Sequence, residues 1–129
     1  MNRTLKPAAL AVVFAALGAL SFDAAAATIR VQCEVRATRA KISVDAKGLA
    51  AGSYRTQAVS GGNMAQSVAE RAVGGEVETD YDSNPADIAA GATAISSSFV
   101  VNGQVAGKVI DSLGNTVIAD TVACRVRSR

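Results

Sequence analysis

The sequence contains no histidine and no tryptophan, and its 129 residues include only two tyrosines and three phenylalanines. The absence of histidine removes the commonest general base, the usual serine and cysteine triads and most transition-metal sites. The scarcity of aromatic rings weakens sugar binding and the stacking of single-stranded nucleic acid. A serine–lysine pair or a carboxylate pair stays open in principle, but no S-x-x-K motif is present, so we predict that the protein is not an enzyme.

The sequence also lacks a large excess of either positive or negative charge. Thirteen basic residues against eleven acidic ones give a formal net charge of +2. Domains dedicated to nucleic acid usually carry a clear basic excess. We therefore expect no nucleic-acid partner.

The first 27 residues have the features of a secretory signal peptide. Arg3 and Lys6 precede an uncharged stretch from Pro7 to Phe22, and Ala25 and Ala27 supply the small residues of a cleavage site. A retained membrane anchor is the alternative, but the stretch is shorter than the ~20 apolar residues of a spanning helix. We expect residues 1–27 to be cleaved and residues 28–129 to form one domain without a transmembrane segment. The protein would be exported, either periplasmic or secreted.

Only two cysteines are present, Cys33 and Cys124, near the two ends of the expected mature chain. An even number of cysteines in an exported protein is typical of a disulfide. Two free thiols are the alternative. In the chain-entropy model, closing so long a loop stabilises a small domain by about 4–5 kcal/mol.

Strict alternation of apolar and polar residues predicts the first and the last strand. From Thr28 to Arg36 every second residue is apolar, which places Cys33 on the buried face. The segment from Thr116 to Arg127 repeats the pattern, with four residues inward: Ile118, Val122, Cys124 and Val126. The disulfide would therefore tie the first strand to the last.

Further strands are expected between these two. Alternation marks Ala40–Val44, Ser53–Val59 and Gly75–Asp82, whereas residues 64–73 fit either helical spacing or an edge strand. Asn102-Gly103 between two apolar runs is a strong hairpin signal.

The stretch "LAAGSYRTQAV", residues 49–59, resembles the pattern L-x-x-G-x-Y-x-x-x-V. It resembles many immunoglobulin-like and fibronectin-like sandwiches, in which a tyrosine anchors a strand entering from a turn. The resemblance implies an architecture and not a function. Together with short strands separated by Gly, Asn and Ser turns, it leads us to predict an all-β fold: a small immunoglobulin-like β-sandwich of about seven strands.

The polar stretch "TDYDSNPADIAAGAT", residues 79–93, is the main candidate site. Four of its residues offer oxygen ligands for calcium: Asp80, Asp82, Asn84 and Asp87. Their spacing resembles the opening of calcium loops. Pro85 and Gly91, however, stand where an EF-hand has glycine and glutamate, so only an irregular calcium site stays open.

A capped helical turn explains more residues of the same stretch. Asn84 would be the N-cap and Pro85 the first helical residue. Asp87 would reach back to the cap, and Gly91 would end the turn with positive φ. Since carboxylates two apart on a strand lie about 6.5–7 Å from each other, the acidic residues before the turn do not readily share one ion. We favour the turn over calcium.

Five arginines could form one basic face if the first and last strands are neighbours: Arg30, Arg36, Arg125, Arg127 and Arg129. Such a face could meet an anionic surface. Alternatively, outward arginines protect strand edges from pairing with other chains.

These observations predict an exported, non-catalytic β-sandwich that acts as a structural or binding module of the cell envelope. Its partner would be a protein or envelope component that the sequence does not identify. We expect no cofactor, and calcium is the one alternative. One alternative is a calcium-dependent adhesion or envelope module. Another is a fimbrial-type assembly subunit, which the chain resembles in its small residues, few aromatics and two cysteines. It differs from such subunits because little of the mature chain precedes Cys33.

Overall fold

The computed structural model describes residues 26–128. Nearly all of the expected signal peptide, residues 1–27, and Arg129 of the basic face lie outside the described residues. Within residues 26–128, no helix is long and apolar enough to cross a membrane.

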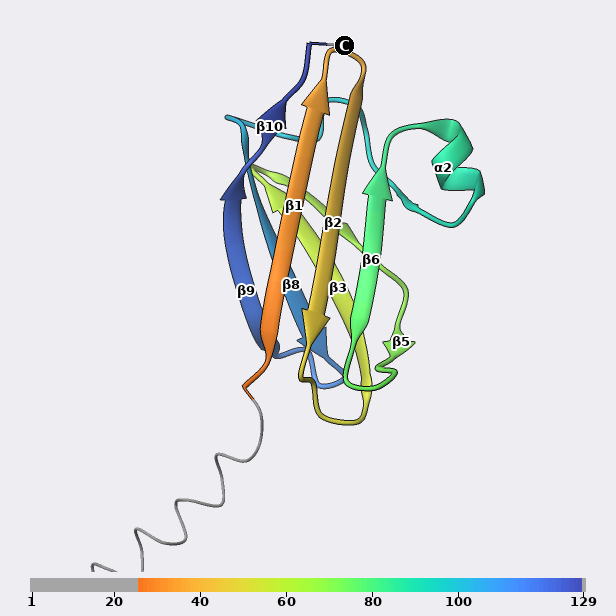
Figure 1. The fold of residues 1–129 in the computed structure, drawn as a ribbon, viewed down its shortest axis with the longest axis vertical. Coiled ribbons are helices and arrows are strands. Elements are labelled where there is room, and N and C mark those ends of the chain that lie inside the picture. The colour runs from red at the N-terminus through yellow and green to blue at the C-terminus, as the bar shows by residue number, and fades with distance from the viewer. Residues whose placement is uncertain (1–25, 129) are drawn as a thin grey trace, which may run out of the picture.

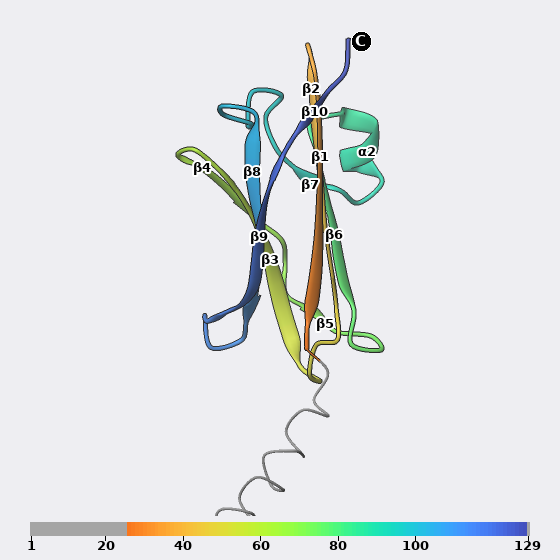
Figure 2. The ribbon, with the colours of Figure 1, turned by 60° about the vertical axis from the view of Figure 1, so that its left-hand side comes forward.

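Two sheets pack face to face as a β-sandwich (Figures 1 and 2). Sheet A has the order β10-β1-β2-β6-β7, formed by Arg125–Val126, Thr28–Arg36, Arg39–Lys47, Val77–Asp82 and Thr93–Ala94. Sheet B has the order β4-β3-β8-β9, formed by Asn63–Gln66, Ser53–Ser60, Gln104–Asp111 and Thr116–Ala123. The short β5 (Glu70–Arg71) also pairs with β3. The helix α2 (Pro85–Ala89) lies on the outer side of sheet A (Figure 2). The prediction of an all-β sandwich is confirmed.

The core forms where the inward faces of the two sheets meet. All four inward residues of β2 are completely buried: Ala40, Ile42, Val44 and Ala46. From sheet B, Val105 and Val109 of β8 are buried opposite them. Gly107 lies between these valines, and a Cβ there would come within 2.6 Å of Val31 Cγ2. The glycine therefore lets β8 approach β1 closely, as expected for a glycine inside a strand.

Two tyrosines fix the sandwich internally. Tyr54, at the start of β3, donates its hydroxyl to the carbonyl of Ala50 over 2.6 Å and so anchors the strand to the turn that precedes it. Tyr81 of β6 shares a 2.5 Å hydrogen bond with Thr56 of β3, which joins the two sheets through the core. Burial raises the pKa of Tyr81 to about 12, although the bond to Thr56 acts in the opposite direction.

The disulfide between Cys33 and Cys124 is present, with a Cα–Cα distance of 4.5 Å. It joins β1 to the chain at the point where the chain leaves β9, the edge strand of sheet B, and enters β10 of sheet A. Figure 2 shows this crossing from one layer to the other. The prediction of one last strand from Thr116 to Arg127 is therefore wrong in detail. Val126 is 77% exposed rather than buried, because sheet B does not cover β10.

The structure also tests the predictions for residues 64–73 and for the turn at Asn102-Gly103. Residues 64–73 are not helical: β4 and β5 form successive short pairings with β3. Asn102 and Gly103 have φ values of 55° and 66°, typical of a tight hairpin turn. The turn is confirmed, but its first arm contributes just one bridge, Val101 to Gln104, because residues 95–100 run as loop and turn.

Candidate functional site

The end of β6 and the beginning of α2 form the polar centre predicted from the sequence. Asn84 has extended backbone angles and its side chain accepts a 2.9 Å hydrogen bond from the Ala86 N–H. Pro85 occupies the first turn, and Gly91 has a φ of 118° just after the helix. The capped helical turn is therefore present as predicted.

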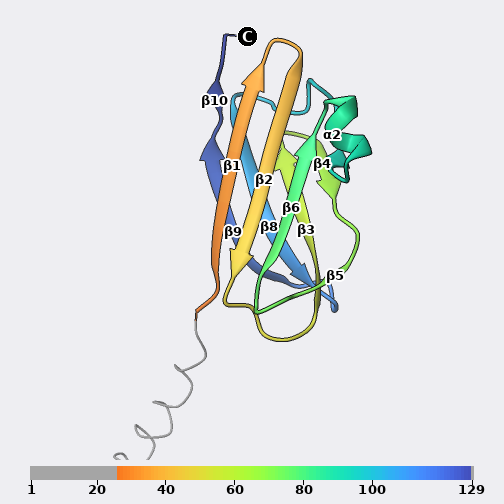
Figure 3. The same ribbon diagram turned by 45° about the vertical axis from the view of Figure 1, so that its right-hand side comes forward.

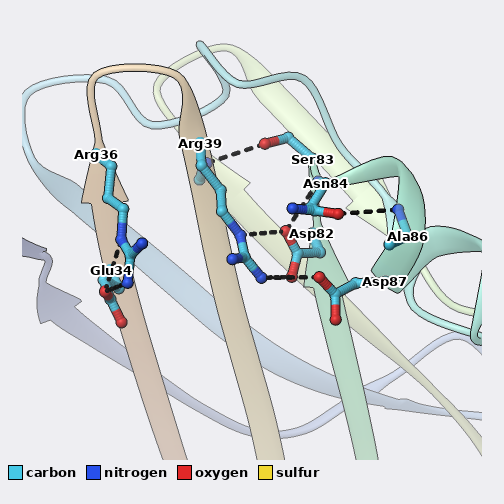
Figure 4. Close-up of polar contacts among 9 residues, drawn as sticks. Glu34, Arg36, Arg39, Asp82, Ser83, Asn84, Ala86 and Asp87 are labelled. Atoms are coloured by element: carbon cyan, nitrogen blue, oxygen red, sulfur yellow. Dashed lines mark hydrogen bonds and ion pairs between the residues drawn. The ribbon is translucent and has the colours of Figure 1, made fainter. Parts of the chain in front are cut away.

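Arg39, at the start of β2, organises this centre (Figure 4). Its guanidinium donates two hydrogen bonds to Asp82, of 3.0 and 2.7 Å, and a third of 2.9 Å to Asp87. Ser83 adds a further link to the same strand, since its hydroxyl accepts a 3.1 Å bond from the Ala40 N–H. The arginine thus fastens α2 and the end of β6 to the β1–β2 hairpin.

Asp82 is 1% exposed, although its position in β6 belongs to the outward face. Burial alone would raise the pKa of Asp82, but the hydrogen bonds from Arg39 and from the Asn84 N–H outweigh it and hold the pKa below its ordinary value. The pKa of Arg39 is raised in turn, chiefly by its hydrogen bond to Asp82. The pair is therefore ionised across the physiological range.

One detail of the predicted turn is wrong. Asp87 does not reach back to the cap; its carboxylate accepts from Arg39. The N–H of Asn84 is bound instead by Asp82 Oδ1, at 2.9 Å. Asp82 takes over this role because the guanidinium draws Asp87 toward β2.

The four proposed calcium ligands are not all brought together. Asp82 and Asp87 share the Arg39 guanidinium, and the Asn84 side-chain oxygen caps α2. Asp80 stays exposed on β6, opposite Ser43 of β2. A calcium ion using all four would have to displace Arg39 and the cap. Calcium binding itself stays a prediction.

A second acidic cluster was only partly visible in the sequence. Oxygen atoms of Asp45, Glu76 and Glu78 lie within 4.8 Å of one another. The hydrogen bond and the charge of Asp45 raise the pKa of Glu76, while Lys47 nearby lowers it. Glu76 and Glu78 lie in the segment Gly75–Asp82 that was predicted as a strand, but Asp45 comes from β2. The register that places Asp45 opposite Glu78 was not predicted.

A groove of about 420 Å³ runs along β6 beside α2. Five carboxylates line it: Glu70, Glu78, Asp80, Asp82 and Asp87. Lys41 is the one cation in its lining. The groove is therefore acidic, and the 67–70 segment that follows β4 forms part of its wall.

The opposite margin of sheet A is basic. β10 pairs in parallel with β1, with Glu34 opposite Arg125, so the first and last strands are neighbours as the basic face requires. Glu34 lies between Arg36, at 3.1 Å, and Arg127, at 2.9 Å. The hydrogen bond from Arg36, supported by the charge of Arg127, lowers the pKa of Glu34. Arg125 has no ion-pair partner within residues 26–128.

The chain matches no protein-family model, and no curated protein or solved structure is detectably similar to it.

Proposed function

We propose that the protein is an exported, non-catalytic β-sandwich that serves as a structural or binding module of the cell envelope. The observation that carries the proposal is the disulfide between Cys33 and Cys124, which closes the domain by linking β1 to the β9–β10 connection. Such bonds form and persist in oxidising compartments and are rare in the cytosol. The basic first residues and small-residue cleavage pattern of the sequence support the same destination.

Cell fractionation combined with thiol trapping tests this proposal. The full chain is expressed, the fractions are treated with an alkylating reagent before lysis is completed, and Cys33 and Cys124 are mapped by mass spectrometry. We expect shortened protein in the periplasmic or secreted fraction, with both cysteines protected from alkylation. Full-length, alkylated protein confined to the cytosol would contradict the proposal.

Calcium-dependent adhesion is the second candidate, using Asp80, Asp82, Asn84 and Asp87. A ligand that binds only the native state must raise its stability, so calcium binding would raise the melting temperature relative to chelator. We favour the capped turn and expect the melting temperature to be the same in millimolar calcium and in EDTA. A calcium-dependent rise that Asp80→Asn abolishes would establish the calcium site instead.

A further inference from the structure

Sheet A ends in two strand edges that are unpaired within residues 26–128. β6 pairs with β2 on one side, but on its other side β7 covers only Tyr81 and Asp82. The edge from Val77 to Asp80 is left open. At the other end of the sheet, β10 pairs only with β1. Figures 1 and 3 show β10 and β6 on either side of the β1–β2 hairpin.

The two edges carry opposite charge. The open edge of β6 borders the acidic groove, and three of its carboxylates have no ion pair within residues 26–128: Glu70, Glu78 and Asp80. On β10 and its continuation, Arg125 and Arg127 are exposed, and Glu34 is shared between Arg36 and Arg127. The basic edge therefore keeps an excess of positive charge, and the acidic edge an excess of negative charge.

The spacing of the charges also matches. Glu78 and Asp80 are two residues apart on one face of β6, and Arg125 and Arg127 are two residues apart on the C-terminal segment. Residues two apart on a strand lie on the same face, about 6.5–7 Å from each other. A strand laid beside β6 in this register brings both arginines next to both carboxylates.

An exposed apolar side chain also lies near each of the two edges. Val126 lies opposite Val35, which packs against the core, so Val126 points to the inner side of sheet A. It is nevertheless 77% exposed. In the wall of the acidic groove, Val68 is also 77% exposed. Burying both valines would favour association.

We propose that the Arg125–Arg127 segment of one copy of this chain docks on the open Val77–Asp80 edge of a second copy. Main-chain hydrogen bonds extend sheet A from one molecule to the next, as in other cases of strand addition. The two surfaces differ, so the contact is head-to-tail and repeats along a row of molecules. The inference rests on the proposed role as a structural module and names its partner as a second copy.

Charge reversal tests the contact. The oxidised protein is examined by sedimentation velocity over a concentration series at low and high salt. Wild-type protein should form oligomers that grow with concentration and dissociate with salt. Glu78→Lys/Asp80→Lys and Arg125→Glu/Arg127→Glu should each weaken self-association at least about tenfold, and their mixture should associate again. Asp120→Lys, on exposed β9, is the matched control and should behave as wild type.

Folding is checked by thermal melting of each variant, because Arg127 contacts Glu34 within the molecule. Arg125→Gln leaves that contact intact and should still weaken association. Monomeric wild type at all concentrations would overturn the inference, as would folded variants whose mixture stays monomeric. Either result would leave the proposed function standing, because fractionation and thiol trapping test that function separately.

Discussion

Arg39 shows how one arginine can determine which interactions two neighbouring aspartates make. Its side chain is 26% exposed and contacts the side chains of Asp82, 2% exposed, and Asp87, 48% exposed. Removing one partner of a buried ion pair is far more costly than removing a surface partner, because the other charge stays without compensation. The contribution of each aspartate to stability should therefore follow its burial.

Asp82→Asn should reduce the free energy of unfolding by about 3 kcal/mol, since it leaves the Arg39 charge without its main partner. Asp87→Asn is the matched control and should cost less than about 1 kcal/mol. Denaturant titration of the three proteins measures both values. Equal losses for the two variants would contradict the assigned role of Asp82.

The lowered pKa of Asp82 also predicts a pH dependence. In the unfolded chain an aspartate titrates near pH 3.9, so the stabilisation is complete above that pH and is lost as the pH falls through the lower pKa of the folded state. The stability difference between wild type and Asp82→Asn should be constant above about pH 5 and shrink below about pH 4. Unfolding titrations at several pH values measure it, and a difference that does not change with pH would refute the ion pair.

At the residue scale, local contacts were predictable and distant ones were not. Asn84 and Pro85 act within a few residues of each other, so their types and spacing indicated the cap. Arg39 reaches Asp82 across 43 positions of sequence. That contact depends on the register between β2 and β6, which alternation does not determine when both strands are buried on one face.

At the scale of elements, the turn before β3 is fixed by Tyr54. Its ring is 7% exposed and its hydroxyl binds the carbonyl of Ala50, so the side chain fastens the strand to the turn that precedes it. This arrangement was indicated by the sequence pattern because all its parts lie within eleven residues, 49–59.

Tyr54→Phe should lower the free energy of unfolding by about 1 kcal/mol, because it removes the hydrogen bond and leaves the packing of the ring in place. Thermal melting in parallel with denaturant titration measures the change. Thr56→Val is a useful comparison, since it deletes the bond to Tyr81 between the sheets. No loss for Tyr54→Phe would show that the Ala50 contact does not stabilise the turn.

The sequence pattern did not predict that the chain passes from sheet B to sheet A at Cys124. Apolar residues alternate without interruption from Val122 through Val126, so the pattern reads as a single strand. The chain nevertheless leaves β9 and continues as β10 beside β1. Alternation reports which side chains share a face, but not which sheet the strand joins.

At the scale of the whole molecule, the disulfide links the two sheets at one margin of the sandwich. Within the described residues, unpaired strand edges are left at the two ends of sheet A. The fold class and the cysteine pairing were predictable because composition and period-two patterning both reflect burial. The unpaired edges, the acidic groove and their opposite charges required the order of the strands. They are properties of the assembled sheet and not of any one segment.

The disulfide between Cys33 of β1 and Cys124 at the β9–β10 connection is the central observation, and its contribution to stability can be measured directly. Reduction opens a link between residues 91 positions apart. In the chain-entropy model this should lower the free energy of unfolding by about 4–5 kcal/mol. Denaturant titration of the oxidised and reduced protein, with Cys33→Ser/Cys124→Ser as control, provides the test. A loss of that size in both the reduced protein and the double variant would support the account, and unchanged stability in both would contradict it.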